Sequence, residues 1–440
     1  MRLLALLVLF CVATTAFAIT PPNDGVTAFT NVHVVPMDSE RVLANQTVLV
    51  EGDRIIAMGA VGEVEVPEGA NVINGSGAYL MPGLAEMHGH IPPPNQSEAY
   101  IESVLFMYVA NGITTVRGML GFPGQLELRE QANSSAIVAP NLYLAGPSFN
   151  GSTVHSPEQA REKVRQQVEE GWDLLKIHPG LTRAEYDAMA ETAHELGITF
   201  GGHVPAQVGL AHALDMRQET FDHIDGYTIA LNGESGNPVD EAALADLVAK
   251  TKEAGAWVVP TMVLWETLYG VPSVDELTSF EELQYMPPNM VDFWVNTHEQ
   301  RTSPRQVPLD IAEQLIDNRM RILEALHDGG VPVLMGTDAP QQFSVPGFSL
   351  HREIARMVEA GMSPYEVIET GTTYVGRYFA DKDTFGQVAP GQRADLVLVN
   401  ENPLEDVSHI ADRRGVMIRG QWLAEADIQA RLAEIAAMYQ

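Results

Sequence analysis

Two histidines two residues apart, His88 and His90, follow a Met-Pro-Gly turn in the stretch MPGLAEMHGH. Residues i and i+2 of a β-strand point to the same face of a sheet, so both imidazoles can turn toward one point. Imidazole nitrogen is a common ligand of Zn²⁺ and related divalent ions. Two histidines also fall close together by chance, so a metal site requires partners elsewhere in the chain.

Four further polar residues stand at or near the ends of short apolar runs. These are Lys176 in LLKIHP, His203 in TFGGHV, His223 in TFDHIDG and Asp338 in VPVLMGTDAP. Four imidazoles and a carboxylate suit zinc or a similar divalent ion. Burial among apolar neighbours is expected to lower the pKa of Lys176 and to keep its amine neutral and nucleophilic. A neutral lysine can capture CO2 as a carbamate, whose two oxygens could bridge two metal ions.

The elements that must position these residues alternate in type. Short apolar runs occupy residues 83–90, 113–119, 141–149, 174–179, 199–204, 220–226, 257–264 and 331–340. Helix-like segments lie between them, such as 156–171 and 182–197, with good start and stop residues. This alternation predicts an α/β fold with a parallel sheet, and eight runs favour a closed (β/α)8 TIM barrel over an open sheet. All six polar residues would then converge at the carboxyl ends of the barrel strands.

The two ends of the chain have a different texture. Short stretches rich in valine and isoleucine, broken by glycine, asparagine and aspartate, predict strands and turns. We therefore predict a small composite β-sandwich domain from residues 19–80 and 385–440, and a barrel from residues 81–384. Residues 265–330 are too long for an ordinary connection and predict an insertion that covers the barrel mouth as a lid or contacts substrate. A surface decoration is the alternative.

The first 18 residues, MRLLALLVLFCVATTAFA, have the features of a secretory signal peptide: an early Arg2, an apolar run and a small-x-small site ending at Ala18. The apolar run is shorter than the ~20 residues that a membrane span needs. We expect cleavage after Ala18 and export to the periplasm or the extracellular space, with no membrane span in the mature protein. Cys11 is the only cysteine, so the mature chain would have no disulfide and no thiolate chemistry.

Acidic residues outnumber basic ones by 58 to 26, which gives a net charge of −32. This balance argues against nucleic acid as a partner, because its phosphates would be repelled. The sequence also has no Gly-rich phosphate loop and no G-x-S-x-G nucleophile elbow around Ser148. It leaves homo-oligomer formation open.

The ordered set of ligands resembles the amidohydrolase superfamily. PGLAEMHGH is similar to its PGL-(I/V)-D-x-H-x-H opening, and the order H-x-H, Lys, His, His, Asp matches its binuclear pattern. FGQVAPGQRADLVLVNENPL is similar to the return segment of its split β domain, so the resemblance spans residues 25–425. NGITTVRGM, LLKIHPG and FDHIDGY resemble the branch of imidazolonepropionase-like proteins and metal-dependent prolidases or carboxypeptidases. Glu86 stands where the pattern has Asp, and Gly118 stands where the branch often has Asp.

This resemblance implies two divalent ions, for which we expect zinc, held by all six residues with Lys176 carboxylated as the bridge. Together with the predicted signal peptide, it implies a secreted hydrolase that cleaves a C–N bond of a small amide, such as a dipeptide or an N-acyl amino acid, by metal-activated hydroxide. Asp338 would take the proton from the attacking water and deliver it to the leaving nitrogen. Ester, lactone or phosphotriester hydrolysis at the same metals is an alternative, as is a metal-binding or peptide-binding protein without turnover.

Four more residues near strand ends are candidates for contact with the substrate. Arg117, His155 and Tyr227 could bind a substrate carboxylate or polarise its carbonyl. His178 lies two residues beyond Lys176 and is expected either to support the ligands or to face the substrate.

Overall fold

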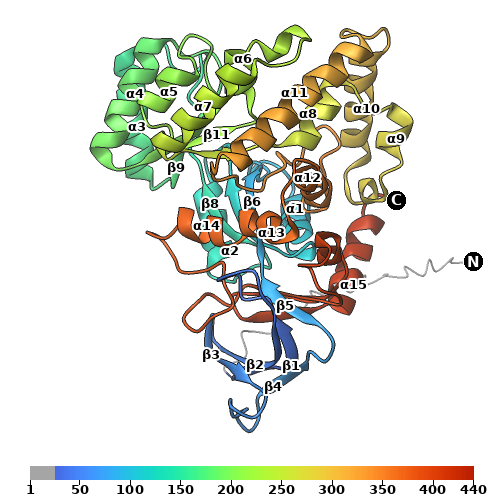
Figure 1. The fold of residues 1–440 in the computed structure, drawn as a ribbon. Helices are drawn as coiled ribbons and strands as arrows, with labels where there is room; N and C mark the ends of the chain where they lie inside the picture. The colour runs from blue at the N-terminus through green and yellow to red at the C-terminus, as the bar shows by residue number, and fades with distance from the viewer. Residues whose placement is uncertain (1–24) are drawn as a thin grey trace, which may run out of the picture.

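The computed structural model of the protein describes residues 25–440, so the predicted signal peptide at residues 1–18 lies outside the described residues. The chain is a mixed α/β protein (Figure 1). The blue strands of its N-terminal segment gather at one end, and helices pack around the cyan and green strands that follow. Within the described range, no helix combines the length and the apolar character needed to cross a membrane.

Seven of the eight predicted apolar runs form parallel strands in the middle of the chain. One sheet contains β6 (Leu84–Gly89), β7 (Ile113–Gly118) and β8 (Asn141–Leu144), and the other contains β9 (Leu174–Ile177), β10 (Thr199–Gly202), β11 (Thr220–Asp222) and β12 (Trp257–Val259). Isolated parallel bridges, Ala145 with Leu174 and Phe149 with Ile177, join the two sheets between β8 and β9. The strands are almost wholly buried, as expected for parallel strands covered by helices.

The eighth predicted run, residues 331–340, is not a regular strand. It makes one parallel bridge, between Val333 and Val258 of β12, and single backbone hydrogen bonds to its neighbours. On the other side, Met87 N of β6 donates to Met335 O at 2.8 Å, and Asp338 N donates to His88 O at 2.7 Å. The described residues therefore contain no continuous eight-stranded parallel ladder, although this segment lies between β12 and β6.

Strands from both chain ends pair into one eight-stranded sheet. They are β1 (Thr27–Val34), β2 (Leu43–Glu51), β3 (Arg54–Ala60), β4 (Asn71–Asn74), β5 (Tyr79–Pro82), β13 (Leu396–Val399), β14 (Arg413–Ile418) and β15 (Gln421–Ala424). The two ends meet where β5 pairs antiparallel with β13, so that Leu80 lies opposite Leu398. Side chains from both ends, including Phe29 and Leu396, share a separate apolar core.

Helices follow most of the central strands. Those up to the predicted insertion are α1 (Glu98–Ala110), α2 (Gln125–Asn133), α3 (Pro157–Glu170), α4 (Arg183–Leu196), α5 (Leu210–Asp215), α6 (Asp225–Ala230) and α7 (Glu241–Ala254). The helix ends expected from the sequence are confirmed for α3 and α4. Ser156 and Thr182 accept hydrogen bonds from the first turns, and Gly171 and Gly197 end the helices with positive φ angles that glycine adopts without strain.

The predicted insertion at residues 265–330 is helical. It contains most of α8 (Met262–Tyr269), then α9 (Val274–Thr278), a short 3-10 helix, α10 (Pro288–Thr302) and α11 (Leu309–Asp328). The chain continues through α12 (Phe348–Glu359), α13 (Pro364–Gly371) and α14 (Thr373–Tyr378), and it ends with α15 (Glu425–Ala437). Helices α8 and α11 contact each other and, as described below, reach a predicted metal ligand.

Candidate metal centre

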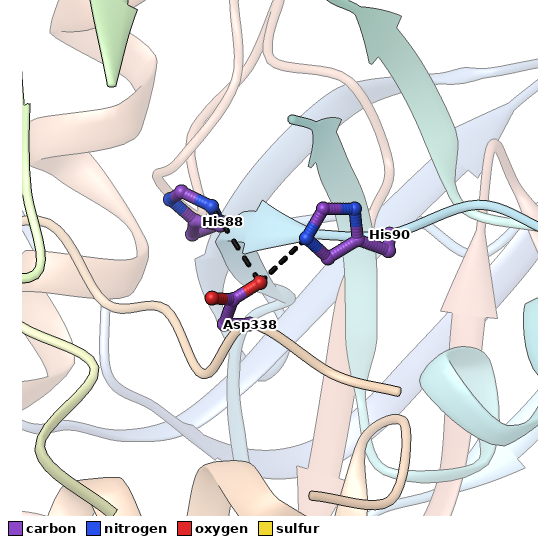
Figure 2. Close-up of side chains that lie close together, drawn as sticks. All are labelled: His88, His90 and Asp338. Carbon is purple, nitrogen blue, oxygen red and sulfur yellow. Dashed lines mark hydrogen bonds and ion pairs between the residues drawn. The ribbon is translucent and has the colours of Figure 1, made fainter. Parts of the chain in front are cut away.

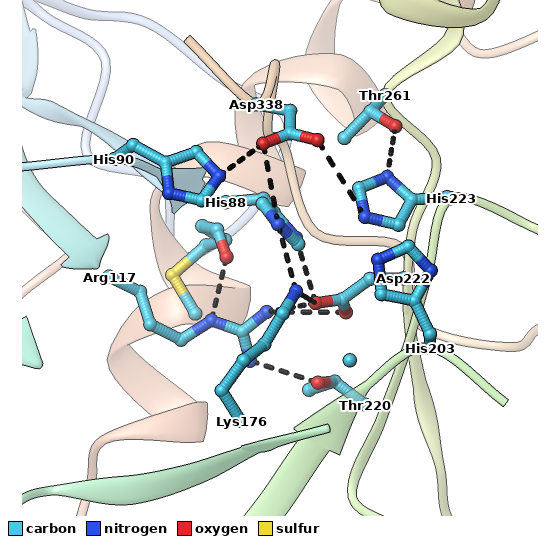
Figure 3. Close-up of polar contacts among 12 residues, drawn as sticks. His88, His90, Arg117, Lys176, His203, Thr220, Asp222, His223, Thr261 and Asp338 are labelled. Carbon is cyan, nitrogen blue, oxygen red and sulfur yellow. Dashed lines mark hydrogen bonds and ion pairs between the residues drawn. The ribbon is translucent and has the colours of Figure 1, made fainter. Parts of the chain in front are cut away.

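The six predicted ligands lie together at the carboxyl ends of the central strands. His88 is in β6 and Lys176 in β9, while His90, His203 and His223 directly follow β6, β10 and β11, and Asp338 comes from the irregular segment. Figure 3 shows their side chains pointing toward a common centre. Asp338 Oδ1 lies 2.5 Å from His90 Nε2 and 3.6 Å from His88 Nε2 (Figure 2). His88, His90 and Asp338 thus offer three atoms within 4.8 Å of one another.

The remaining ligands close the cluster from the other side. The second carboxylate oxygen of Asp338 lies 3.7 Å from His223 Nε2. The rings of His203 and His223 have centroids 4.5 Å apart, and Lys176 Nζ lies 3.1 Å from His88 Nε2. Residues spread over about 250 positions of the sequence therefore share one site, as expected for residues at the carboxyl ends of neighbouring parallel strands.

Three of the histidines have a polar partner close to their outer nitrogens. His88 Nδ1 lies 2.8 Å from Asp222, His203 Nδ1 lies 2.6 Å from Asp225, and His223 Nδ1 lies 2.8 Å from Thr261 Oγ1. A carboxylate beside Nδ1, as at His88 and His203, places the ring proton there and leaves Nε2 as a lone-pair donor that faces the cluster. The hydroxyl of Thr261 can donate or accept, so it orients the ring of His223 without fixing its tautomer. This arrangement is typical of histidines that bind metal ions.

Burial favours the neutral forms of three nitrogen bases of the site, His88, His223 and Lys176. Burial lowers the pKa of His88 and of His223 well below the usual value, and Lys176 adds to the effect on both. Burial also lowers the pKa of Lys176, although Asp222 and Asp338 oppose this. Because neutral nitrogen is the form that binds a metal ion, the donor set fits a divalent cation.

Asp222 is a central residue that the sequence prediction missed. It is buried and lies below the site, where it contacts His88 and lies 4.0 Å from Lys176 Nζ. Arg117 Nη2 donates to both of its oxygens, at 3.3 and 3.4 Å. The available signal is its position in FDHIDG, directly before His223, but adjacent residues of a strand point to opposite faces, so the pattern does not place it at the site.

Two of the predicted substrate contacts, Arg117 and Tyr227, are buried in this structure, so their contact with substrate stays a prediction. Arg117 is 0% exposed, and besides Asp222 its guanidinium donates to Met87 O, Thr220 and Tyr378. Tyr227 is also 0% exposed, and its hydroxyl lies 2.9 Å from Thr251 Oγ1. Arg117 lies in β7 and Tyr227 in α6, and the polar groups of both side chains are paired within the core.

His155 is exposed in the loop between β8 and α3. It lines a cavity of about 670 Å³ between α2 and α3, together with Lys163 and Trp172. Its contact with substrate stays a prediction.

Glu86, which stands where the superfamily pattern has aspartate, fastens the segment that carries Asp338. Its Oε1 accepts from His88 N at 2.9 Å and from Thr337 N at 2.8 Å, and its Oε2 accepts from Thr337 Oγ1 at 2.6 Å. Burial raises the pKa of Glu86 to about 7. The longer side chain thus links β6 to the irregular segment, where Asp338 has a φ of +65°.

The insertion reaches the site through two side chains. The guanidinium of Arg319 in α11 stacks 3.7 Å from the ring of Trp265 in α8 and donates to the backbone oxygen of His223. Trp265 lies 6.3 Å from the imidazole of His223, measured between ring centroids. Part of the insertion therefore contacts a predicted ligand, and its role as a lid or substrate contact stays a prediction.

The α/β fold and the converging donor set are those expected of the class of hydrolases that the sequence pattern predicted. The chain belongs to the Amidohydrolase family, whose model matches residues 79–423. This confirms the resemblance stated above and places the chain among hydrolases that act on C–N bonds.

Relatives and solved structures agree with this assignment. "Ochratoxinase" of Aspergillus niger is 23% identical over 452 residues, covering 87% of this chain and 83% of that protein. "Adenine deaminase 3" of Rhizobium meliloti (strain 1021) is 21% identical over 414 residues, covering 89% of this chain but only 56% of that longer protein. The crystal structure of a putative prolidase from Bifidobacterium longum superposes with a TM-score of 0.71 at 21% identity, covering 94% of this chain and 100% of that one.

Proposed function

We propose that the protein is a binuclear metal-dependent hydrolase that cleaves the amide bond of a small substrate, such as a dipeptide or an N-acyl amino acid. The observation that carries the proposal is the cluster of four imidazoles, a buried lysine and Asp338, with three histidines oriented through their outer nitrogens. Relatives named for prolidase and ochratoxinase chemistry support a C–N bond as the target.

Two divalent cations, zinc by our proposal, fit these donors. When bound, they would supply Lewis-acid polarisation of the carbonyl and lower the pKa of water. His88, His90, His203 and His223 would hold them, with Asp338 as the carboxylate ligand. Lys176 would bridge them as a carbamate, because its neutral amine is the form that reacts with CO2.

Asp338 is proposed to move the proton. Its Oδ1 faces His90 and its Oδ2 faces His223, so one carboxylate reaches both halves of the cluster. A carboxylate held there can accept a proton from the attacking water and donate it to the leaving nitrogen. Glu86, through Thr337, holds that carboxylate in place.

The finer fold and location are part of the same proposal. The two parallel sheets and the 331–340 segment would form a (β/α)8 barrel over residues 81–384, and the shared end sheet of residues 19–80 and 385–440 would fold as a small β-sandwich. Removal of residues 1–18 would release the enzyme to the periplasm or the extracellular space.

Two measurements on the purified full chain test the proposal. Elemental analysis of protein prepared without chelators is expected to find about two divalent ions per chain, and fewer than two would reject the binuclear site. A panel of dipeptides, N-acyl amino acids, lactones and esters is expected to show fastest turnover on an amide. Faster turnover of a lactone or ester would reassign the substrate class, and no turnover at all would favour a binding protein.

A further inference from the structure

The loop after β8 contains a chain of hydrogen bonds whose direction can be read from one end. The Oδ1 of Asn150 accepts from Ser152 N at 2.9 Å. A backbone N–H can only donate, so this contact identifies the oxygen of the Asn150 carboxamide and leaves its Nδ2 on the other side. That Nδ2 donates to the hydroxyl oxygen of Ser148 at 3.0 Å.

The hydroxyl of Ser148 accepts from Asn150 and therefore has its own proton available for His178. Ser148 is 6% exposed, and its Oγ lies 2.6 Å from His178 Nδ1. Among the described residues this hydroxyl makes only these two hydrogen bonds, and a buried O–H without an acceptor is costly. The hydroxyl therefore donates to Nδ1, and the neutral ring of His178 carries its proton on Nε2.

His178 thus has the opposite tautomer to the ligand histidines beside it. Its ring centroid lies 5.1 Å from that of His203, whose Nδ1 faces Asp225 and whose Nε2 is free to bind metal. An Nε2 that carries a proton cannot ligate through that atom, but it can donate a hydrogen bond. Backbone hydrogen bonds from Phe149 N to Lys176 O and from His178 N to Phe149 O keep the loop in register with β9.

His178 also lies beside the metal cluster, with its ring next to that of His203. It lies two residues beyond Lys176 and is partly exposed, whereas Arg117 and Tyr227 are buried and occupied by the core. A donor aimed at a carbonyl oxygen as it gains negative charge contributes strongly to amide hydrolysis.

We propose that His178 is a further catalytic residue, whose Nε2–H donates a hydrogen bond to the carbonyl oxygen of the scissile amide, and that Ser148 and Asn150 are positioning residues that set its tautomer. This proposal rests on the proposed amide hydrolysis at the metal cluster. The proposal requires that the bound substrate places an uncharged acceptor, the carbonyl oxygen of its amide, next to His203 and within reach of His178 Nε2.

The test compares four variants of the full, metal-loaded chain on the dipeptide that the wild type cleaves fastest. His178→Ala is expected to lower kcat by about 10²–10³-fold with unchanged metal content. His178→Gln places an amide N–H near the position of Nε2 and is expected to recover most of that loss. In Asn150→Asp, the new carboxylate accepts the Ser148 proton, so His178 must protonate Nδ1 and lose its donor, and kcat falls about tenfold or more. Asn296→Asp, at an exposed position of α10, is the matched control.

A second readout reports the tautomer directly. In ¹H–¹⁵N spectra of histidine-labelled protein, His178 is expected as the Nε2–H form in the wild type and as the Nδ1–H form in Asn150→Asp. An Nδ1–H form in the wild type, or a kcat of His178→Ala within threefold of the wild type, overturns the inference and leaves amide hydrolysis standing. A wild type that cleaves no amide overturns the proposed function and this inference together.

Discussion

Replacing Asp222 by asparagine should weaken metal binding although Asp222 is not a predicted ligand. Arg117 can only donate, so the oxygen of the new side chain turns toward the guanidinium that now lies 3.3 Å from Asp222. The Nδ2 of Asn then faces His88 Nδ1, which lies 2.8 Å from the present carboxylate, and two donors oppose each other. His88 must move its proton to Nε2, the nitrogen that faces the cluster.

The size of the effect follows from these contacts. Loss of the group that orients a ligand histidine lowers metal affinity by about 10–100-fold. The metal-free protein also loses stability, because breaking a buried ion pair costs about 3–5 kcal/mol. We expect the lower end, about 3 kcal/mol, since Arg117 keeps its hydrogen bonds to Met87 O, Thr220 and Tyr378.

Competitive titration with a chromophoric chelator measures the zinc affinity, and denaturant unfolding of the chelated protein measures the stability. Asp215→Asn, at an exposed position of α5, controls for the loss of one carboxylate and should change neither quantity. If Asp222→Asn binds zinc within threefold of the wild type and unfolds within about 1 kcal/mol of it, Asp222 does not orient His88 and the reasoning is refuted.

Three further outcomes are expected. Asp338→Asn should fold and keep most of its metal while kcat falls about 10²-fold or more, and a near wild-type kcat in the metallated variant would exclude Asp338 as the proton carrier. Lys176→Ala should lose at least one metal and its activity, with partial rescue by short carboxylic acids; full metal content would exclude the bridge. Burial lowers the pKa of His351 from 6.5 to about 4, so the unfolded chain binds its proton first and stability should fall as pH drops from about 6.5 to 4. In His351→Gln the free energy of unfolding, measured by denaturant titration at several pH values, should depend less on pH between about 6.5 and 4. If this pH dependence is unchanged, groups other than His351 cause it.

The sequence alone predicted the ligand set and much of the scaffold because these depend on local patterns. Apolar runs alternating with capped helices predict parallel strands, and seven of the eight runs are strands. Helix ends such as Ser156 and Gly197 depend only on neighbouring backbone groups. The His, Lys and Asp residues stand at or near the ends of five of the eight runs, which places all six at the same ends of the strands, so their meeting required no knowledge of individual contacts.

Only the tertiary structure decided which residues contact and orient those ligands. Arg117 and Asp222 are 105 positions apart in the sequence. From its position near a strand end, Arg117 is expected to contact substrate, and only its burial and its hydrogen bonds show that it pairs with Asp222. The irregular path of residues 331–340 depends likewise on Glu86, which is about 250 positions away. The tautomer of His178 depends on the Asn150 and Ser148 contacts of a separate loop. Burial, proton position and the direction of a hydrogen bond are properties of groups brought together by folding, and no local pattern encodes them.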